Sequence, residues 1–387
     1  MKQFILIDHL KVQNANAVAG FTWGFPAITN FLGFVHNLGR KLANEEKFQD
    51  ITLAGCAVIA HEHNVHTYGS HERMFTQSRN PPYLPSHNKA ATPPVIEEGK
   101  MNMTVSLLIG CEGNIGNRAD IFQQWLKNAC LLQRLAGGTI LDMADVSFFA
   151  PQDQRDVRII TRRLLPGFVL IDRSQYLEDH YQELSKANHD TELLDAWLDF
   201  SALKQKARPK SNLISKHLQQ LLKKDPENQQ LIQLVEVWQN HLAIPYDEND
   251  IPAEIKIFFE QLEDNTTNKK LLEQWQDYAA PNNKTDADWR YIEKPRSGYL
   301  VPIMTGYKAI SKVYDNAEVS CTRDSETDVC FVESVHSIGE WKSAHHLKTP
   351  EQLQDCLWQY QYEENWYLCK QGIALQDEEA EEETIYY

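Results

Sequence analysis

Histidines at alternating spacing are the first residues of this 387-residue chain whose type and position suggest chemistry. His61 and His63 stand two residues apart in a β-like stretch, and alternate residues of a strand face the same side. Imidazoles bind zinc and transfer protons near neutral pH. His66 faces the opposite side if the strand continues, so a metal site lacks further ligands in register. We therefore predict no metal and no cofactor, and interpret these histidines as surface or arm residues.

Motifs of known catalytic sites are missing from the sequence. It has no G-x-S-x-G, no P-loop and no H-E-x-x-H. Its seven cysteines form no C-x-x-C pair and are odd in number, which favours neither a zinc knuckle nor a disulfide framework.

Aromatic and amide side chains near the start could bind a nucleic acid. The segment 22–26 leads into a predicted helix, whose first N–H groups could hold a phosphate. Trp23 and Phe25 could stack on bases or could pack in the core. Asn14 and Asn16 could read base edges or could only form turns.

An arginine–asparagine pair, an arginine pair and a glycine pair are further candidates. Arg79-Asn80 lies in a proline-rich segment, and Arg162-Arg163 precedes the apolar run 164–168. In an extended segment one arginine of a pair could contact a phosphate while the other forms a salt bridge, although both could be solvated. Gly137-Gly138 could stop a helix or approach a ligand phosphate closely.

Charge is unevenly distributed along the chain. The whole sequence carries a net charge of −16, which argues against general affinity for nucleic acid. Residues 1–174 hold 17 Lys and Arg against 15 Asp and Glu, a net of +2, so the remainder has a net of −18. The segment 201–224 has no acid and could meet a nucleic-acid backbone or an acidic partner, or could be a solvated helical face. Its cations are Lys204, Lys206, Arg208, Lys210, Lys216, Lys223 and Lys224.

Hydrophobic periodicity predicts the elements that position these residues. Strands are expected at 4–12, 51–66, 101–109 and from 139, with a loop at 13–17, a protruding arm at 67–98, and helices after Pro26 and Asn117. This order is that of a split βαβ, ferredoxin-like sheet.

The rest of the chain is predicted to be mainly helical and then extended again. We expect a core at 1–174, a helical region at 175–290 with an inserted bundle at about 205–285, and the end of the core at 291–387. The acidic tail 377–383 is expected to be disordered. No apolar run reaches the roughly 20 residues of a membrane span, so we expect a cytoplasmic protein without membrane contact.

Ten short blocks, in order, resemble the family of the second subunit of type I-F (Csy) CRISPR surveillance complexes, a Cas-five-group RAMP protein. They are QNANA (13–17), TWGFP (22–26), FLGFVHNL (31–38), SRNP (78–81), EEGK (97–100), RLAGGTIL (134–141), TRRLLPGF (161–168), GYLVPI (298–303), GYKAIS (306–311) and FVESVHSIGEW (331–341). The resemblance covers about residues 1–204 and 286–345, and the segment 205–285 departs from it.

This resemblance implies an α+β fold, a RAMP-type ferredoxin-like (RRM-like) sheet with a thumb-like arm, here with an inserted helical bundle. It implies a subunit that binds the 5′ handle of the guide RNA (crRNA) and is not an enzyme. The implied partners are the large Csy subunit, the repeated Csy backbone subunit and target double-stranded DNA near its flanking recognition motif. The RNA-binding residues that the matched blocks and the chemistry above imply are Asn14, Asn16, Trp23, Arg79, Asn80, Arg134, Gly137, Gly138, Arg162 and Arg163.

Two other hypotheses stay open at the level of sequence. A RAMP-class endoribonuclease that processes the CRISPR transcript would use His61, His63 or His71 as general acid or base, but no second positioned group is identifiable. A generic acidic adaptor is the third class.

Overall fold

The computed structural model describes residues 3–69, 73–79, 83–87, 89–92, 95–244, 246, 251–263, 265–322 and 324–372. The chain divides into two compact units, one formed by Met1–Ser201 with Arg296–Tyr387 and the other by Ala202–Pro295. Helices α4 (Ser174–Ala187) and α5 (Leu193–Ser201) belong to the first unit. Their buried side chains share a core with Leu300 and Ile338 of the sheet.

The first half of the large sheet is built around β1 (Gln3–Asn16). This strand pairs antiparallel with β11 (Lys100–Glu112), β13 (Gly138–Asp142) and β14 (Asp145–Phe149), and β11 pairs with β4 (Thr52–Val65). The strand order is therefore β13-β1-β11-β4. All four predicted strands are confirmed, but the predicted loop at 13–17 is wrong, because β1 continues to Asn16 through a bulge between Val12 and Ala15.

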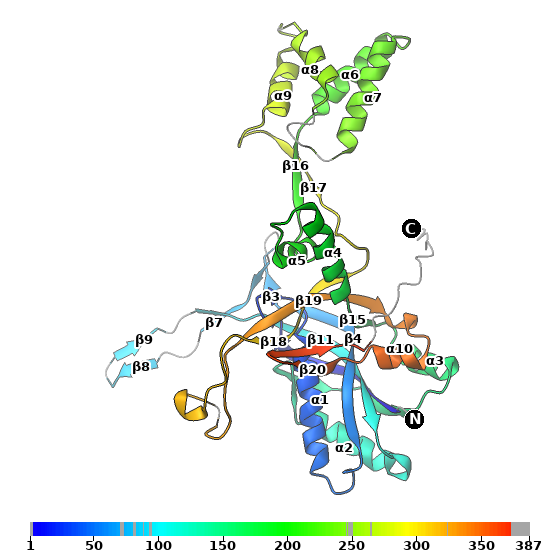
Figure 1. Cartoon of the computed structure of the whole chain (residues 1–387), viewed down its shortest axis with the longest axis vertical. Coiled ribbons are helices and arrows are strands. Elements are labelled where there is room, and N and C mark those ends of the chain that lie inside the picture. Colours follow the sequence, from blue (N-terminus) through cyan, green and yellow to red (C-terminus); the bar gives the residue numbers. More distant parts are fainter. Residues whose placement is uncertain are drawn as a thin grey trace. The chain divides into compact units, whose positions relative to one another are not determined.

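Helices α1 (Ile28–Ala43) and α2 (Ala119–Leu131) contact each other beneath this part of the sheet (Figure 1). The apolar residues predicted to form one face of the first helix are buried: Phe31, Phe34, Val35, Leu38 and Leu42. They pack with the inward side chains of β1, β4 and β11 in one core. Burying each such side chain contributes about 1.5–3 kcal/mol, so the amphipathic pattern fixes which face of the sheet α1 covers.

The C-terminal residues of the first unit extend the same sheet. Five strands follow β4 in the order β15 (Phe168–Asp172), β19 (Val332–Ser343), β18 (Leu300–Ala309), β21 (Trp366–Lys370) and β20 (Gln359–Glu363). With β12 (Arg134–Leu135) and β14 the sheet has eleven strands. Helix α10 (Pro350–Asp355) begins with a capping box in which the Thr349 hydroxyl accepts from the Gln352 N–H. The chain is thus an α+β protein, as predicted.

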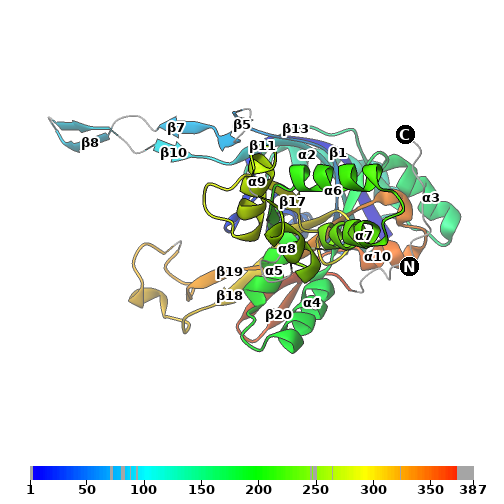
Figure 2. The same ribbon diagram turned by 90° about the horizontal axis from the view of Figure 1, so that it is seen from above.

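The proline-rich segment between β4 and β11 forms short two-stranded sheets. They are β5 (Thr67–Tyr68) with β6 (Met74–Phe75), β7 (Gln77–Arg79) with β10 (Val95–Glu97), and β8 (Tyr83–Ser86) with β9 (Lys89–Ala91). Figure 2 shows β7, β10 and β8 leading away from the ends of β4 and β11 as an arm.

Helix α3 (Gln154–Arg163) corrects the expectation that Arg162-Arg163 is extended. The Asp153 side chain caps the helix by accepting from the N–H groups of Arg155 and Asp156. Val157 and Ile160 are buried against the opposite face of the sheet from α1, together with Phe4 and Leu6. The two arginines stand in the last turn, where cations favour the negative end of the helix dipole.

The second unit is a small helical bundle with a two-stranded ribbon. Strands β16 (Gln205–Pro209) and β17 (Ala287–Tyr291) pair antiparallel. Between them lie α6 (Asn212–Lys224), α7 (Gln229–Ala243), α8 (Ala253–Glu260) and α9 (Lys269–Ala279), which confirm the helical texture of this segment. Their core is separate from that of the sheet and includes Ile214, Leu218, Trp238, Phe259 and Tyr278.

Among the described residues, every helix is too short or too polar to cross a bilayer. The acidic segment 377–383 lies outside the described residues.

Candidate functional site

A cavity of about 440 Å³ opens where β4 and β15 separate from each other. Aromatic rings from four segments line it, those of Trp23, Phe25, Phe168, Tyr299 and Trp341, together with His61 and His63 of β4. We call it the aromatic pocket. Trp23 and Phe168 are each 49% exposed and Tyr299 is 67% exposed. No acidic side chain lines the pocket within the described part of the chain.

The two aromatic residues that precede α1 have different roles. Phe25 stacks on Phe31 with ring centroids 5.6 Å apart and meets the Trp341 ring edge-on at 4.8 Å. It therefore belongs mainly to the core, one of the two readings predicted for it. Trp23 lies in β3 (Thr22–Trp23), which pairs with β2 (Val18–Ala19). Its indole contacts Phe75, at the base of the arm, edge-on with ring centroids 4.8 Å apart, and about half of the residue's surface is exposed.

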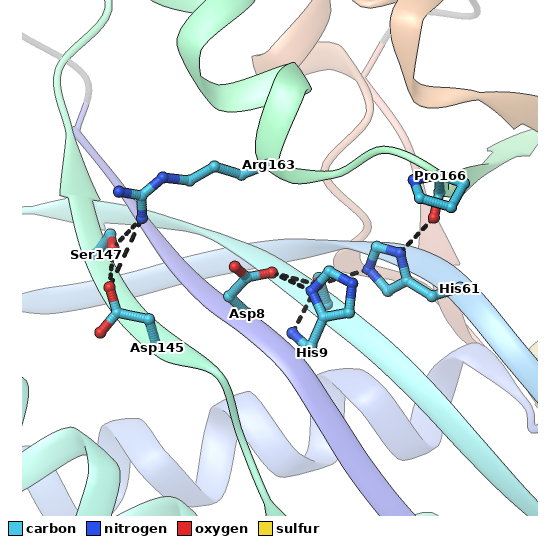
Figure 3. A network of polar contacts seen from close by, with 8 residues as sticks. Asp8, His9, His61, Asp145, Ser147, Arg163 and Pro166 are labelled. Carbon is cyan, nitrogen blue, oxygen red and sulfur yellow. Dashed lines mark hydrogen bonds and ion pairs between the residues drawn. The ribbon is translucent and has the colours of Figure 1, made fainter.

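One wall of the pocket is held by a network of polar contacts (Figure 3). The His61 Nδ1 atom lies 2.7 Å from the Pro166 carbonyl oxygen, and its Nε2 atom lies 2.7 Å from the Ser106 hydroxyl. The His61 ring stacks on His9, with centroids 3.9 Å apart. The Nδ1 atom of His9 lies 2.6 Å from a carboxylate oxygen of Asp8.

The hydrogen-bond partners of His61 and its burial determine its protonation state and tautomer. Burial is the main cause that lowers its pKa, so the neutral ring is favoured. A carbonyl oxygen only accepts, so the single N–H of neutral His61 lies on Nδ1 and points to Pro166. Nε2 then accepts the single Ser106 hydroxyl proton at 2.7 Å, a shorter contact than the 3.1 Å from the same hydroxyl to an Asp8 carboxylate oxygen. The hydroxyl oxygen in turn accepts from the His9 backbone N–H at 2.9 Å. Both ring nitrogens of His61 are therefore occupied by the protein itself.

The same cluster does not fit a metal centre. Asp8, His9 and His61 offer ligand atoms within 4.8 Å of one another. A metal binds an imidazole nitrogen in the plane of the ring, whereas the rings of His9 and His61 are stacked with only 18° between their planes. Two nearly parallel stacked rings cannot share one ion in both planes. The metal hypothesis that we weighed for His61, His63 and His66 and did not adopt gains no support, because among the described residues neither His63 nor His66 belongs to this group.

Arginines gather on α3, where sequence reasoning found only the last two. Arg155, Arg158 and Arg162 lie at helical spacing along one exposed face, which we call the arginine row. Within the described part of the chain, none of the three forms a salt bridge or a side-chain hydrogen bond. Arg163 is instead engaged: it donates to the Ser147 hydroxyl at 2.6 Å and pairs with Asp145 at 3.6 Å (Figure 3). Its guanidinium also lies over the Phe149 ring.

A second group of predicted residues meets at the end of β1. The N–H of Asn16 donates to Ala136 in the turn between β12 and β13, and Arg134 is exposed on β12 beside it. The Asn16 amide closes a turn by bonding both the N–H and the carbonyl of Val18, so of the two roles predicted for it the turn is the one observed. Asn14 is exposed and has a φ of 57°.

The glycine pair is a hairpin turn and not a helix stop, because α2 already ends at Leu131. Ala136 and Gly137 have φ values of 49° and 74°, as two-residue hairpins between antiparallel strands require. A Cβ on Gly138 would lie 2.7 Å from the backbone of Gln13 and Ala15, whereas one on Gly137 would meet nothing within 4 Å. Gly138 therefore permits close approach of β13 to β1, and only Gly137 faces open space.

The remaining predicted residues are more widely placed. Arg79 ends β7 of the arm, while Asn80 and His71 lie outside the described residues. In the second unit, Lys206, Lys216, Lys223 and Lys224 are exposed, and Lys210 pairs with Asp286 at 3.3 Å. The prediction that Arg208 is a surface contact residue is wrong. Arg208 is buried, and its guanidinium donates to the carbonyls of His241, Leu242 and Ile244 at the end of α7. It stabilises the bundle and cannot contact DNA.

The chain is an α+β protein whose antiparallel sheet carries an arm, an aromatic pocket and surface arginines. The sequence model described as CRISPR-associated protein (Cas_Csy2) matches residues 5–224 and 210–369. CRISPR-associated protein Csy2 of Pseudomonas aeruginosa (strain UCBPP-PA14) is 29% identical over 377 residues, which cover 93% of this chain and 91% of that protein. The chain belongs to the Csy2 family, so the family indicated by the ordered sequence blocks, that of the type I-F Csy complex, is confirmed.

Proposed function

We propose that the chain is a non-catalytic subunit of a type I-F RNA-guided surveillance complex and that it binds the 5′ handle of the guide RNA. The observation that carries the proposal is the arginine row of Arg155, Arg158 and Arg162, exposed and unpaired within the described part of a chain whose net charge is −16. Unpaired surface guanidinium groups suit phosphate oxygens, which they bind bidentately. Because the chain belongs to the Csy2 family, we take guide RNA as the phosphate-bearing ligand of the arginine row.

The fold supports the same proposal. The order β13-β1-β11-β4, with α1 after β1 and α2 after β11, is the order that a ferredoxin-like sheet would have, and this supports the proposal. We propose that this half of the sheet is the RRM-like RAMP core and that the segment between β4 and β11 is the thumb-like arm. Arg79 in the arm, together with Asn14, Trp23, Arg134 and Gly137 near the end of β1, then contributes further RNA contacts.

The network around His61 favours a binding role over endoribonuclease chemistry. A general acid or base needs a ring nitrogen free to reach the substrate, and both nitrogens of His61 are engaged. Ser106 pairs with His61 as a nucleophile would pair with its base, but Ser106 is fully buried. His63 is exposed and has no positioned partner among the described residues.

Partner surfaces are proposed from exposed apolar side chains and from charge. The loop between β18 and β19 exposes Ile310, Val313 and Phe331, which suits docking of the large or the repeated Csy subunit. The exposed lysines of the second unit are proposed to meet target double-stranded DNA near its recognition motif.

Purification of a tagged chain from cells that produce the whole operon tests the proposal. We expect the chain to carry one class of small RNA with a common 5′ end, together with companion Csy subunits. Incubation of the purified chain with repeat RNA should give no cleavage product. Recovery without small RNA, or site-specific cleavage abolished by His61→Gln or His63→Gln, would contradict it.

A further inference from the structure

We propose that the aromatic pocket captures one unpaired base of the guide RNA, turned out of the strand and stacked between rings from distant segments of the chain. The inference rests on the proposed function and adds to it a binding site for a single nucleobase. It concerns the cavity lined by Trp23, Phe168 and Tyr299, with His61 in its wall.

The chemistry of the pocket matches a flat, neutral ring. Three large aromatic residues from different segments, each between 49% and 67% exposed, surround one cavity. With no acid or lysine in the lining, the pocket has nothing to neutralise a charged ligand group, whereas the π-faces suit any base. Sequence-specific RNA recognition commonly works on unpaired bases that stack on aromatic rings.

The size and rigidity of the pocket point the same way. Its volume of about 440 Å³ lies in the range of small-ligand sites, roughly 300–1,000 Å³, and suits one nucleoside. The His61 wall is fixed by hydrogen bonds at both nitrogens and by the stacked His9 ring. Phe25, which also lines the pocket, is held by its stacking on Phe31. A preformed site loses little entropy when the base enters.

Arg73 is a cation near the aromatic pocket that can contact the phosphate next to the captured base. Trp23 separates the aromatic pocket from a smaller hollow that is lined by Arg73, Met74 and Phe75 at the base of the arm. A strand that inserts a base on one side of the indole can place its backbone toward Arg73 on the other. One residue thus borders both the base site and a phosphate contact.

The test combines an abasic scan of the guide with pocket variants in the assembled complex. Each nucleotide of the 5′ handle is replaced in turn by an abasic site, and guide affinity is measured for the wild type, Trp23→Ala and Tyr299→Ala. At one position we expect the wild type to lose about 5- to 150-fold in affinity, the range for one stacked base. At that position the pocket variants should lose less than about 2-fold in affinity, because the stacking contact is already absent before the base is removed.

Matched controls separate stacking from general damage. Tyr299→Phe and Trp23→Phe keep a ring and should keep the position-specific loss, whereas Tyr362→Ala removes an equally exposed ring outside the pocket and should behave as the wild type. If every abasic position costs the same in wild type and pocket variants while guide binding persists, the base site is refuted and the proposed function stands. If the wild-type complex binds no guide at all, both fail.

Discussion

The role of His61 in the structure differs from the roles that its sequence spacing suggests. Its alternation with His63 suggested a metal or an acid–base group, yet it is a wall residue whose nitrogens bond Pro166 and Ser106. The groups that face it are Asp8 and His9 of β1 and Glu62 of its own strand. Burial is the largest effect on the pKa of His61 and lowers it, and His9 lowers it further. The hydrogen bond to Pro166 and the charges of Asp8 and Glu62 raise the pKa, but the net direction is down.

This direction predicts how stability depends on pH. An unfolded histidine has a pKa of about 6.5, and the folded state of this one titrates lower. Above about pH 6.5 both states are neutral and the full stability is present. As the pH falls below that value the unfolded chain takes the proton first, so the free energy of unfolding decreases toward the folded pKa. We expect the melting temperature of the wild type to fall between pH 7.5 and pH 5.

Comparison with His61→Gln isolates this residue from other buried histidines. His217, His336 and His346 also have pKa values lowered mainly by burial, and they act in the same direction in both proteins. Calorimetry should therefore show a smaller fall in melting temperature for His61→Gln than for the wild type. An equal fall in both proteins would mean that His61 does not titrate on unfolding.

At the scale of elements, the sequence predicts the strands and helices that have a regular hydrophobic period. It misses helix α3, whose sequence also has features of an extended segment. The strands and α1 were predictable because their apolar residues repeat with the period of the element. Helix α3 was missed because twin arginines followed by an apolar run and Pro166 resemble an extended segment. The signal was present in Asp153 as a cap and in Val157, Ile160 and Leu164 at helical spacing.

The aromatic pocket was beyond prediction for a different reason. Trp23, Phe168 and Tyr299 are more than a hundred residues apart from one another in the sequence. They meet because β15 pairs with both β4 and β19, and β19 with β18. Local patterns carry no information on such pairings between distant strands, so Phe168 and Tyr299 were not among the predicted site residues.

The arginine row on α3 gives a prediction for RNA binding. Replacing Arg155, Arg158 and Arg162 by Gln keeps good helix formers and removes three charges. For single-stranded RNA each lost phosphate contact reduces the slope of log K against log salt by about 0.7, so we expect a reduction of about 2. Titration of guide RNA at several salt concentrations measures it. Lys47→Gln, at an exposed position after α1, is the control, and an unchanged slope in the triple variant would exclude α3 from the interface.

At the scale of the whole molecule, the chain divides into two units, and the two kinds of nucleic-acid contact that we propose lie on different units. The sheet and the helical bundle have independent cores, so surface changes in one leave the packing of the other intact. The bundle is not basic overall: residues 202–295 hold 13 Lys and Arg against 15 Asp and Glu. Any affinity for target DNA must therefore come from a local face, and the exposed lysines of β16 and α6 form the candidate face.

Two charge-matched quadruple variants test that face within the same unit. One replaces Lys206, Lys216, Lys223 and Lys224 by Gln, and the other replaces Lys256, Lys269, Lys270 and Lys284, which are equally exposed. Both change the net charge by −4, so long-range repulsion of DNA is equal and only direct contacts differ. We expect the first variant to bind target duplex more weakly, with a salt slope reduced by about 0.9 per lost contact, and both to bind guide RNA as the wild type does. Equal DNA affinity in the two variants would place the target-DNA contacts of the complex elsewhere, since a face that binds phosphate directly cannot lose four cations without a change in slope.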